Sequence, residues 1–568
     1  MCAAAGYTRR EMTHHYTVLH GGTILTFSGA LPSDAATRAG GDPGVPDAAG
    51  RRATAICYAH ERVLAIGADE EIRALAGPDS HVVDLGGRAV LPGFVEPHAH
   101  PYWEGFVAGM ALIAGRDRRA ALRAVPGAAE RLEPDAWLVA RYDPTGWDRP
   151  DDPTRDDLDR AVPDRPVLLA HVSGHAATAN SLALALASIG TGTPDQPGRM
   201  MIDRDGSGEP TGIIRGPDAW DRVAAAMPPA TAAEGRAALA RAADLLAADG
   251  VTNVADADVG ATHGVATELA AWGAAISSGE MPLRVALLPG LVRIAPGPGD
   301  AVPSPAEIAG LLPESVRDRV RLTHVKLKAD GALTTHTAWL RAPYADAPHA
   351  GGPVHDPEVL AERVRRAVQV GWGIATHAIG DAAVAAVLDA YAAAPPAPPS
   401  ARAHRLEHAM LLDAGLAARL AASGVTAVVQ PEFLAWAAAT YGARLGDERA
   451  ARLLPFAALL AAGIPMAFSS DRPVVAGAPL DGVRAALRHD AGLSVAEAFH
   501  AWTAAGALAL GDEDAGRLEV GYRADLVILS GDPTAISRDG WSRADDGIRV
   551  VATVAAGRLV AGGLAGLE

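Results

Sequence analysis

Short apolar runs separated by turn residues dominate both ends of the chain. The first end contains YTVLHGGTILTF, ATAICYA, RVLAIG and HVVDLGG, and the last contains GRLEVGYRADLVILSGDP and IRVVATVAAGRLVAGG. Runs of this length, bounded by Gly, Asp or Pro, predict β-strands. We expect residues 16–90 and 511–568 to form one composite β domain, a small β-sandwich built from both chain ends. Residues 1–15 are expected to be a disordered extension, with Met1 and Met12 as alternative starts.

The long middle of the chain, residues 91–510, alternates helical patterns with short apolar runs. Helices are predicted over 231–250, 356–371 and 413–424, each ending at glycine and each followed by a strand-like run. Repeated units of this kind predict a parallel sheet, and over this length an α/β fold of the (β/α)8 TIM-barrel type. Residues 143–230, rich in Asp, Pro and Gly, fit the repeat poorly and are expected to be a cap-like insertion near the active-site mouth.

Composition narrows the class of protein. The formal net charge of −17 argues against nonspecific nucleic-acid binding, which needs a basic surface. Cys2 and Cys57 are the only cysteines, so a disulfide framework and a Cys-based zinc site are excluded. No apolar run approaches the ~18 residues of a membrane span, and none near the start suits a signal peptide. We expect a cytoplasmic protein with a small-molecule substrate and no membrane partner; apolar helical surfaces are compatible with a homodimer.

The stretch LPGFVEPHAHPYWEG, residues 91–105, places His98 and His100 one residue apart after an apolar run. If residues 94–100 continue as a strand, both imidazoles point to the same face, because side chains alternate with a period of two. Two neutral imidazoles on one face make half of a metal site. The alternative is an exposed pair in a turn.

Further polar residues stand near the ends of later predicted strands. THVKLKADG places His324, Lys326 and Lys328 on one face, and two lysines facing a barrel interior are costly unless they serve a purpose. Three more strand ends carry His377, His408 and Asp471. Each residue alone is explained as a hydrogen-bonded structural group. Their order along successive units indicates a functional site at the carboxyl ends of the strands.

Over nearly its whole length the chain resembles the amidohydrolase superfamily, and within it the amidohydrolase-3 family. That family includes N-substituted formamide deformylases and YtcJ-like metal-dependent hydrolases. The resemblance rests on LPGFVEPHAH, GWDRPDDPTRDDLD, GHAATANSLAL, VKLKADGALTTHTA, HAIGDAAVAAVLDAY, HRLEHAM, LLAAGIPMAFSSDRPV and GYRADLVILSGDP. It implies a metal-dependent amidohydrolase, a hydrolase acting on carbon–nitrogen bonds other than peptide bonds.

The resemblance also implies a ligand set for one or two divalent ions. Its members are His98, His100, Lys326, His377, His408 and Asp471. The two histidines of the HxH pair and Asp471 would bind the more buried ion, and the other two histidines the second. Lys326 would bridge the ions as a carbamate, because a buried lysine has a lowered pKa and its neutral amine captures carbon dioxide. The alternative is a Lys326 paired with an acidic residue. Zinc is the expected metal, and manganese, iron and cobalt also suit these ligands.

By this resemblance, a metal-activated hydroxide cleaves a C–N amide-type bond in an N-substituted amide or formamide. Lys326 and Asp471 are the expected catalytic residues, with Asp471 as general acid and base. A heterocycle deaminase on the same barrel is one alternative, although deaminases generally lack the bridging lysine. A non-catalytic binding homologue is another, although such proteins lose metal ligands.

Four residues are candidates for substrate contact. His175 matches a Gly-His of the family, and Trp103 and Trp147 are candidates for an apolar pocket, with core packing as the alternative. His336 stands where relatives are expected to carry arginine, as does Ala382. These two departures lie in the expected binding region, so the substrate is not carried over from the family.

Overall fold

The computed structural model of the 568-residue chain describes most of it. The described residues are 16–28, 50–113, 115–130, 132–133, 136–144, 152–172, 176–196, 200–216, 219–401, 403–541, 547–563 and 565. The predicted N-terminal extension, residues 1–15, lies outside them, as do the predicted substrate contacts Trp147 and His175. Among the described helices none is long and apolar enough to cross a membrane.

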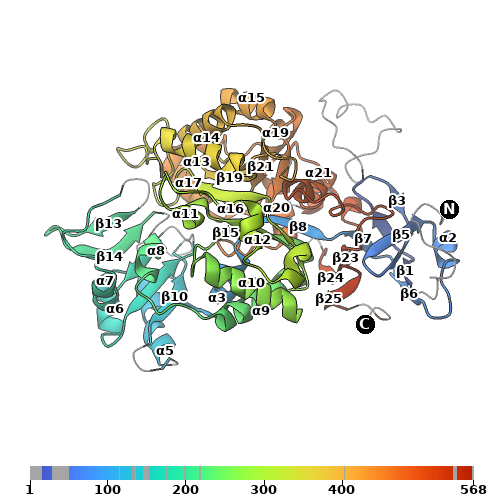
Figure 1. Ribbon diagram of the computed structural model, residues 1–568, viewed down its shortest axis with the longest axis horizontal. Coiled ribbons are helices and arrows are strands. Elements are labelled where there is room, and N and C mark those ends of the chain that lie inside the picture. Colours follow the sequence, from blue (N-terminus) through green and yellow to red (C-terminus); the bar gives the residue numbers. More distant parts are fainter. Residues whose placement is uncertain are drawn as a thin grey trace.

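Two parallel sheets form the centre of a mixed α/β fold (Figure 1). The first has the order β17-β16-β15-β8, with β8 Phe94–Ala99, β15 Val251–Val259, β16 Arg284–Pro289 and β17 Val320–Arg321. The second has the order β18-β19-β20-β21-β22, with β18 His324–Lys328, β19 Gly373–Ala378, β20 Arg405–His408, β21 Thr426–Val429 and β22 Met466–Phe468. Helices follow most of these strands, as the alternation in the sequence predicts.

Backbone contacts join the two sheets at two places. A parallel bridge links Gly290, just after β16, to Lys326 in β18. At the second place, the amide of Asp471 donates to the carbonyl of His98, and the amide of His100 donates to the carbonyl of Arg472, both at 2.9 Å. The ends of β8 and β22 are thereby fixed side by side.

The three predicted helices are confirmed, and their ends follow the expected chemistry. They are α9 Ala232–Ala248, α13 Pro357–Gln369 and α15 Ala414–Ser423. Thr231 and Glu234 form a capping box that satisfies the first amides of α9. Gly424 ends α15 with φ +65°, a left-handed conformation that costs glycine little. The strands between such helices are buried, and every residue of β15 is buried along its length.

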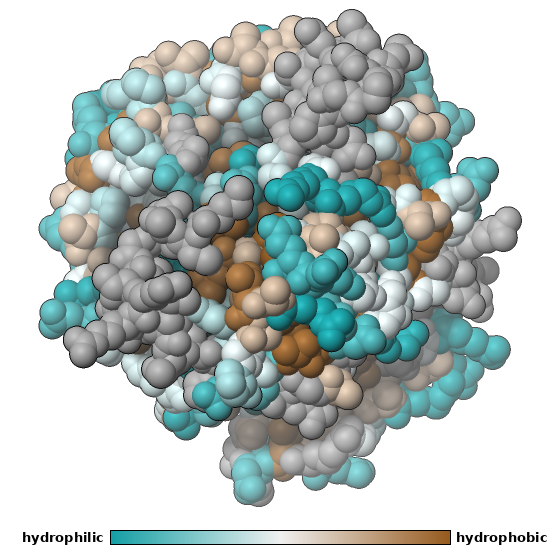
Figure 2. Space-filling model, turned by 90° about the vertical axis from the view of Figure 1, so that its right-hand side faces the viewer, coloured by the Kyte–Doolittle hydropathy of each residue, from teal (hydrophilic) through white to brown (hydrophobic). Residues whose placement is uncertain are grey.

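Segments from both chain ends meet in one mixed sheet at the right of Figure 1. Its order is β25-β24-β23-β7-β2-β3, with β25 Arg558–Gly562, β24 Val550–Ala555, β23 Leu526–Leu529, β7 Ala89–Pro92, β2 Thr23–Leu25 and β3 Arg52–Ala53. A second sheet has the order β5-β4-β1-β6, with β5 Arg62–Gly67, β4 Ala55–Ala59, β1 Thr17–His20 and β6 His81–Asp84. Ile24, Ile56 and Leu526 share one buried cluster between them. Figure 2 views this end of the molecule, where hydrophobic residues are visible between hydrophilic ones.

A further mixed sheet lies at the opposite end of the molecule, at the left of Figure 1. Its order is β13-β14-β12-β11-β10-β9, with β13 Met201–Arg204, β14 Pro210–Arg215, β12 Ala176–Ala179, β11 Val167–His171, β10 Leu138–Tyr142 and β9 Ala111–Ile113. This sheet begins at Ala111, before the insertion start predicted at residue 143. The runs ALI and LVARY lack the turn-rich composition of the later residues, so the sequence pattern assigned them to the barrel units. The domain division as a whole stays a prediction.

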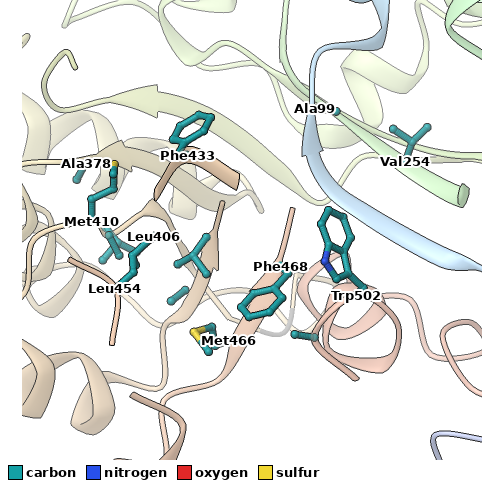
Figure 3. Packing of buried hydrophobic residues seen from close by; sticks show 14 of the residues in the cluster. Ala99, Val254, Ala378, Leu406, Met410, Phe433, Leu454, Met466, Phe468 and Trp502 are labelled. Carbon is teal, nitrogen blue, oxygen red and sulfur yellow. The ribbon is translucent and has the colours of Figure 1, made fainter. Parts of the chain in front are cut away.

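Buried side chains behind β22 and β8 hold the C-terminal helices against the central sheets. Met466 and Phe468 of β22 and Trp502, which follows α21 Val495–Ala501, lie in this core (Figure 3). The amide of Val95 in β8 donates to the carbonyl of Trp502 at 2.8 Å. A strand that carries candidate ligands is therefore fixed by helices from the far end of the chain.

Candidate metal centre

The six predicted ligands converge at the carboxyl ends of the central strands. His98 and His100 have ring centroids 5.6 Å apart, and those of His98 and His408 lie 5.0 Å apart. The rings of His377 and His408 lie 4.4 Å apart. Parallel strands end at the same edge of a sheet, which is why residues far apart in sequence meet here. Among the described residues, ligand atoms of His98, His100 and Asp471 all lie within 4.8 Å of one another.

The ring of His98 is oriented by a buried ion pair. Its Nδ1 bonds Glu407 Oε2, and Arg405 donates to both Glu407 oxygens at 2.8 and 3.0 Å. Arg405 also donates to the carbonyl of Pro97 at 2.7 Å, so it holds both the ring and the backbone of β8. With Nδ1 committed, Nε2 of His98 faces the centre of the site.

The carboxylates around His98 favour a positive charge at its ring. Burial and Lys326 lower the pKa of His98, but the carboxylates of Glu407 and Asp471 outweigh them and raise it. Burial also opposes ionisation of Glu407, yet Arg405 and His98 hold its pKa well below the usual range. Glu407 therefore remains an anion, and it stabilises a cation at the other nitrogen of His98.

Asp471 supplies the test of whether these residues fit a metal ion. Its Oδ1 lies 3.1 Å from His100 Nε2 and 3.4 Å from His98 Nε2, but in the described part of the chain this buried atom has no hydrogen bond. Three ligand atoms thus point at a common centre without bonding one another, as a metal-ligand set does. Burial raises the pKa of Asp471, and the two imidazoles lower it well below its usual range, so the carboxylate stays ionised. The residues fit a divalent cation.

Lys326 and Lys328 have different surroundings. Lys328 Nζ lies 3.0 Å from Asp258 Oδ2 and forms an ion pair. Lys326 Nζ lies 3.1 Å from His98 Nε2, and within the described ranges no carboxylate oxygen comes within 4.0 Å of it. Burial lowers the pKa of Lys326 to about 8. Lys326 is therefore the lysine with access to the neutral amine form near physiological pH.

The remaining two histidines each have one ring nitrogen held by a hydrogen bond. His408 Nδ1 donates to Gln430 Oε1 at 2.7 Å, and Gln430 Nε2 donates to Ser469 Oγ at 2.8 Å. Burial lowers the pKa of His408 to about 3. His377 Nε2 donates to the carbonyl of Gly331 at 2.9 Å. Such a hydrogen bond fixes the orientation of an imidazole, as the outer partner of a metal-ligating histidine does.

Three supporting residues carried no separate prediction in the sequence. Arg405 and Gln430 orient candidate ligands as described above. Glu96 accepts from the amides of His98 and Ser470, both at 3.1 Å, and so ties β8 to the segment before Asp471. Burial raises the pKa of Glu96 to about 7. Glu96 shares the strand face of the HxH pair, so the period-two pattern that selected the histidines could have found it.

The predicted substrate contacts are placed unequally. Trp103 lies beside the site, with its ring centroid 6.0 Å from that of His100. His336 instead hydrogen-bonds Asp346 Oδ1 through its Nε2 at 2.9 Å, and its ring contacts Tyr344. The binding roles of both stay predictions.

Comparisons with protein families, with known sequences and with solved structures agree on the family of this chain. A family model described as the amidohydrolase family matches residues 81–561. The chain is 31% identical over 507 residues to the protein YtcJ of Bacillus subtilis (strain 168), covering 86% of this chain and 92% of that protein. It is 28% identical over 533 residues to the N-substituted formamide deformylase of Arthrobacter pascens, with the same coverage of 86% and 92%. The crystal structure of an uncharacterized metal-dependent hydrolase from Pyrococcus furiosus is similar at a TM-score of 0.66 and 27% identity, over 91% of this chain and 100% of that one.

Proposed function

The chain belongs to the amidohydrolase family, as its motifs predicted, and we propose that it cleaves a C–N amide-type bond in an N-substituted amide or formamide. The family places it among metal-dependent hydrolases of the amidohydrolase type. The name of the Arthrobacter pascens relative supports the choice of N-substituted formamides as test substrates. The single observation that carries the proposal is the convergence of His98, His100 and Asp471.

We also propose that the two central sheets form one (β/α)8 TIM barrel. Its strands would be β8, β15, β16, β18, β19, β20, β21 and β22 in chain order. The bridge at Lys326 and the two hydrogen bonds beside Asp471 support this closure. A barrel accounts for a site at the carboxyl ends of its strands, where loops set specificity.

In the proposed site, His98, His100 and Asp471 would hold the more buried ion. His377 and His408 would hold a second ion, and Lys326, as a carbamate, would be a ligand shared by the two ions. To form that carbamate, the neutral Nζ attacks the carbon of carbon dioxide and loses one proton to solvent, which leaves one negative charge shared by two oxygens. Histidine and carboxylate ligands suit zinc first, and manganese, iron or cobalt next.

When bound, the metal supplies Lewis acidity, which makes water a nucleophile at neutral pH and polarises the scissile carbonyl. Asp471 is ionised, so it can accept the proton of the attacking water and return it to the departing amine nitrogen. Arg405 and Glu407 hold His98, and Gln430 holds His408, so the ligands need no reorganisation during the reaction.

The environment of Glu407 argues against a deaminase. A deaminase of this superfamily would be expected to use a glutamate near these histidines as its proton carrier. Glu407 is fully buried, and Arg405 and His98 already occupy its oxygens. It therefore has a positioning role, and hydrolysis of an amide remains the favoured function.

The test is metal content by elemental mass spectrometry on protein purified without chelator. We expect about two ions per chain in the wild type, fewer in Lys326→Ala, and no change in the control Lys328→Ala. Turnover of a panel of N-substituted amides and formamides should vanish in Asp471→Ala with the circular dichroism spectrum retained. A metal-free active wild type, or undiminished turnover in Asp471→Ala, would overturn the proposal.

A further inference from the structure

Two cavities with opposite chemistry flank the candidate metal centre. The first has His377, His408 and Asp471 on its floor; we call it the apolar cavity. Its principal walls are Leu333, Ile379, Phe433, Trp436, Tyr441 and Val474. The second is lined by Asp258, Arg293, Lys326 and Lys328, among others; we call it the charged cavity.

The wall of the apolar cavity disfavours a charged group. Among the described residues that line this cavity, the ionisable side chains are His377, His408 and Asp471 on the floor and the phenol of Tyr441. The ring of Phe433 lies parallel to that of His408, with centroids 6.2 Å apart and an interplanar angle of 9°. Trp436 continues this row at 6.0 Å from Phe433. A charge brought against such a wall would lose its hydration without gaining a partner, whereas an uncharged apolar group is favoured there.

The cavity is also small, and most of its wall is fixed. Its volume is about 30 Å³, roughly the space of two water-sized groups, and the ion that His377 and His408 would hold takes part of that space. Leu333, Phe433 and Tyr441 are buried, and Phe433 belongs to the main core (Figure 3). Trp436 is half-buried, at the end of α16 Pro431–Trp436. Leu333 and Trp436 both line the cavity, so shortening either side chain would enlarge it.

We propose that the apolar cavity is the subsite for the smaller of the two substituents on the scissile amide. It takes an uncharged apolar group of about methyl size, and Leu333 and Trp436 determine this limit. The larger substituent is directed away from this wall. This inference rests on the proposed amide hydrolysis and adds the substrate class: amides with one short, uncharged substituent.

Two homologous series of substrates test the size limit. One lengthens the acyl group from formyl to butanoyl on a constant amine, and the other lengthens the N-alkyl group from methyl to butyl on a constant acyl group. In the wild type, kcat/KM should fall about tenfold or more per methylene beyond the limit in one series. A terminal carboxylate in that substituent should reduce kcat/KM further. The series with the cut-off identifies the substituent that occupies the cavity.

Enlarging the cavity should move the cut-off. Leu333→Ala and the milder Trp436→Phe should raise kcat/KM for the next longer substrate about tenfold relative to the shortest one. Val354→Ala, in the wall of the charged cavity, is the matched control and should leave the ranking unchanged. Calorimetric binding of the corresponding ketones, in which a methylene replaces the amide nitrogen, should show the same ranking without turnover.

The outcomes separate this inference from the proposed function. If the wild type hydrolyses no amide, the proposed function fails. If it hydrolyses amides with no length cut-off in either series, the function stands and the inference fails. The inference also fails if Val354→Ala shifts the ranking while Leu333→Ala and Trp436→Phe, both folded by circular dichroism, do not.

Discussion

Replacing Glu407 by Gln tests whether the buried ion pair behind His98 positions a metal ligand. The amide oxygen of glutamine can still accept from His98 Nδ1, but the negative charge is lost. Arg405, which is fully buried, then keeps its bond to the Pro97 carbonyl and loses its counter-ion. Removing one partner of a buried pair costs about 3–5 kcal/mol of unfolding free energy. That is a large part of the roughly 5–15 kcal/mol available to a domain.

The same change should weaken metal binding independently of its effect on stability. Loss of an anionic acceptor behind a ligating histidine lowers metal affinity by about 10–100-fold. The matched control is Asp512→Asn, which removes a buried carboxylate from Arg321 at 2.7 Å and Arg284 at 3.1 Å. Asp512 also bonds Asn253, near the amino end of β15, away from the metal centre.

Chemical denaturation measures the stability of both variants, and titration of the metal-free protein against a competing chelator measures affinity under native conditions. We expect both variants to lose stability and Glu407→Gln alone to lose affinity. Wild-type affinity in Glu407→Gln, or an equal loss in Asp512→Asn, would show that the pair is only a structural element.

Three further predictions concern stability. Burial and Arg517 lower the pKa of His500 to about 4, so between about pH 6.5 and 4 the unfolded chain binds a proton that the folded chain does not. The free energy of unfolding therefore decreases by roughly 3 kcal/mol as pH falls through this window. Denaturation curves recorded at a series of pH values measure this decrease, which should be smaller by that amount in His500→Gln. Gly105→Ala would place Cβ 1.8 Å from the carbonyl oxygen of Ala238 and should lower the melting temperature sharply. Gly109→Ala at the end of the same helix has its nearest neighbour at 3.5 Å and should be neutral or stabilising. Removing metal with a chelator should lower the melting temperature, and adding zinc at a hundred times its Kd should restore about 2.7 kcal/mol.

The features that follow from local periodicity could be predicted from the sequence. The period of two in FVEPHAH placed His98 and His100 on one strand face, and β8 extends over Phe94–Ala99. Glycine after an amphipathic run marked the end of α15, which the structure places at Ser423 with Gly424 in the cap. Both depend on neighbours in the sequence, for which the physical rules are well defined.

Features that depend on distant partners could not be predicted in the same way. His98 and Glu407 are 309 residues apart, and no local pattern specifies which acidic side chain reaches Nδ1. The hydrogen bond of His336 to Asp346 was equally inaccessible, because His336 lies in a long loop with φ +58° and the bond depends on that loop's conformation. Loop conformation is set by tertiary contacts, which a hydrophobic pattern does not contain.

Backbone conformation gives an independent reason to treat the converging side chains as a functional set. His408 has φ +72° and Asp471 has φ +59°, in the left-handed region that costs a non-glycine residue about 1–3 kcal/mol. Such conformations persist only where the surroundings enforce them. Here Gln430 holds the ring of His408, and the amide of Asp471 is bonded to the carbonyl of His98. A purely structural strand end would gain stability by relaxing, so retention of both conformations in two candidate ligands favours selection for the position of their side chains.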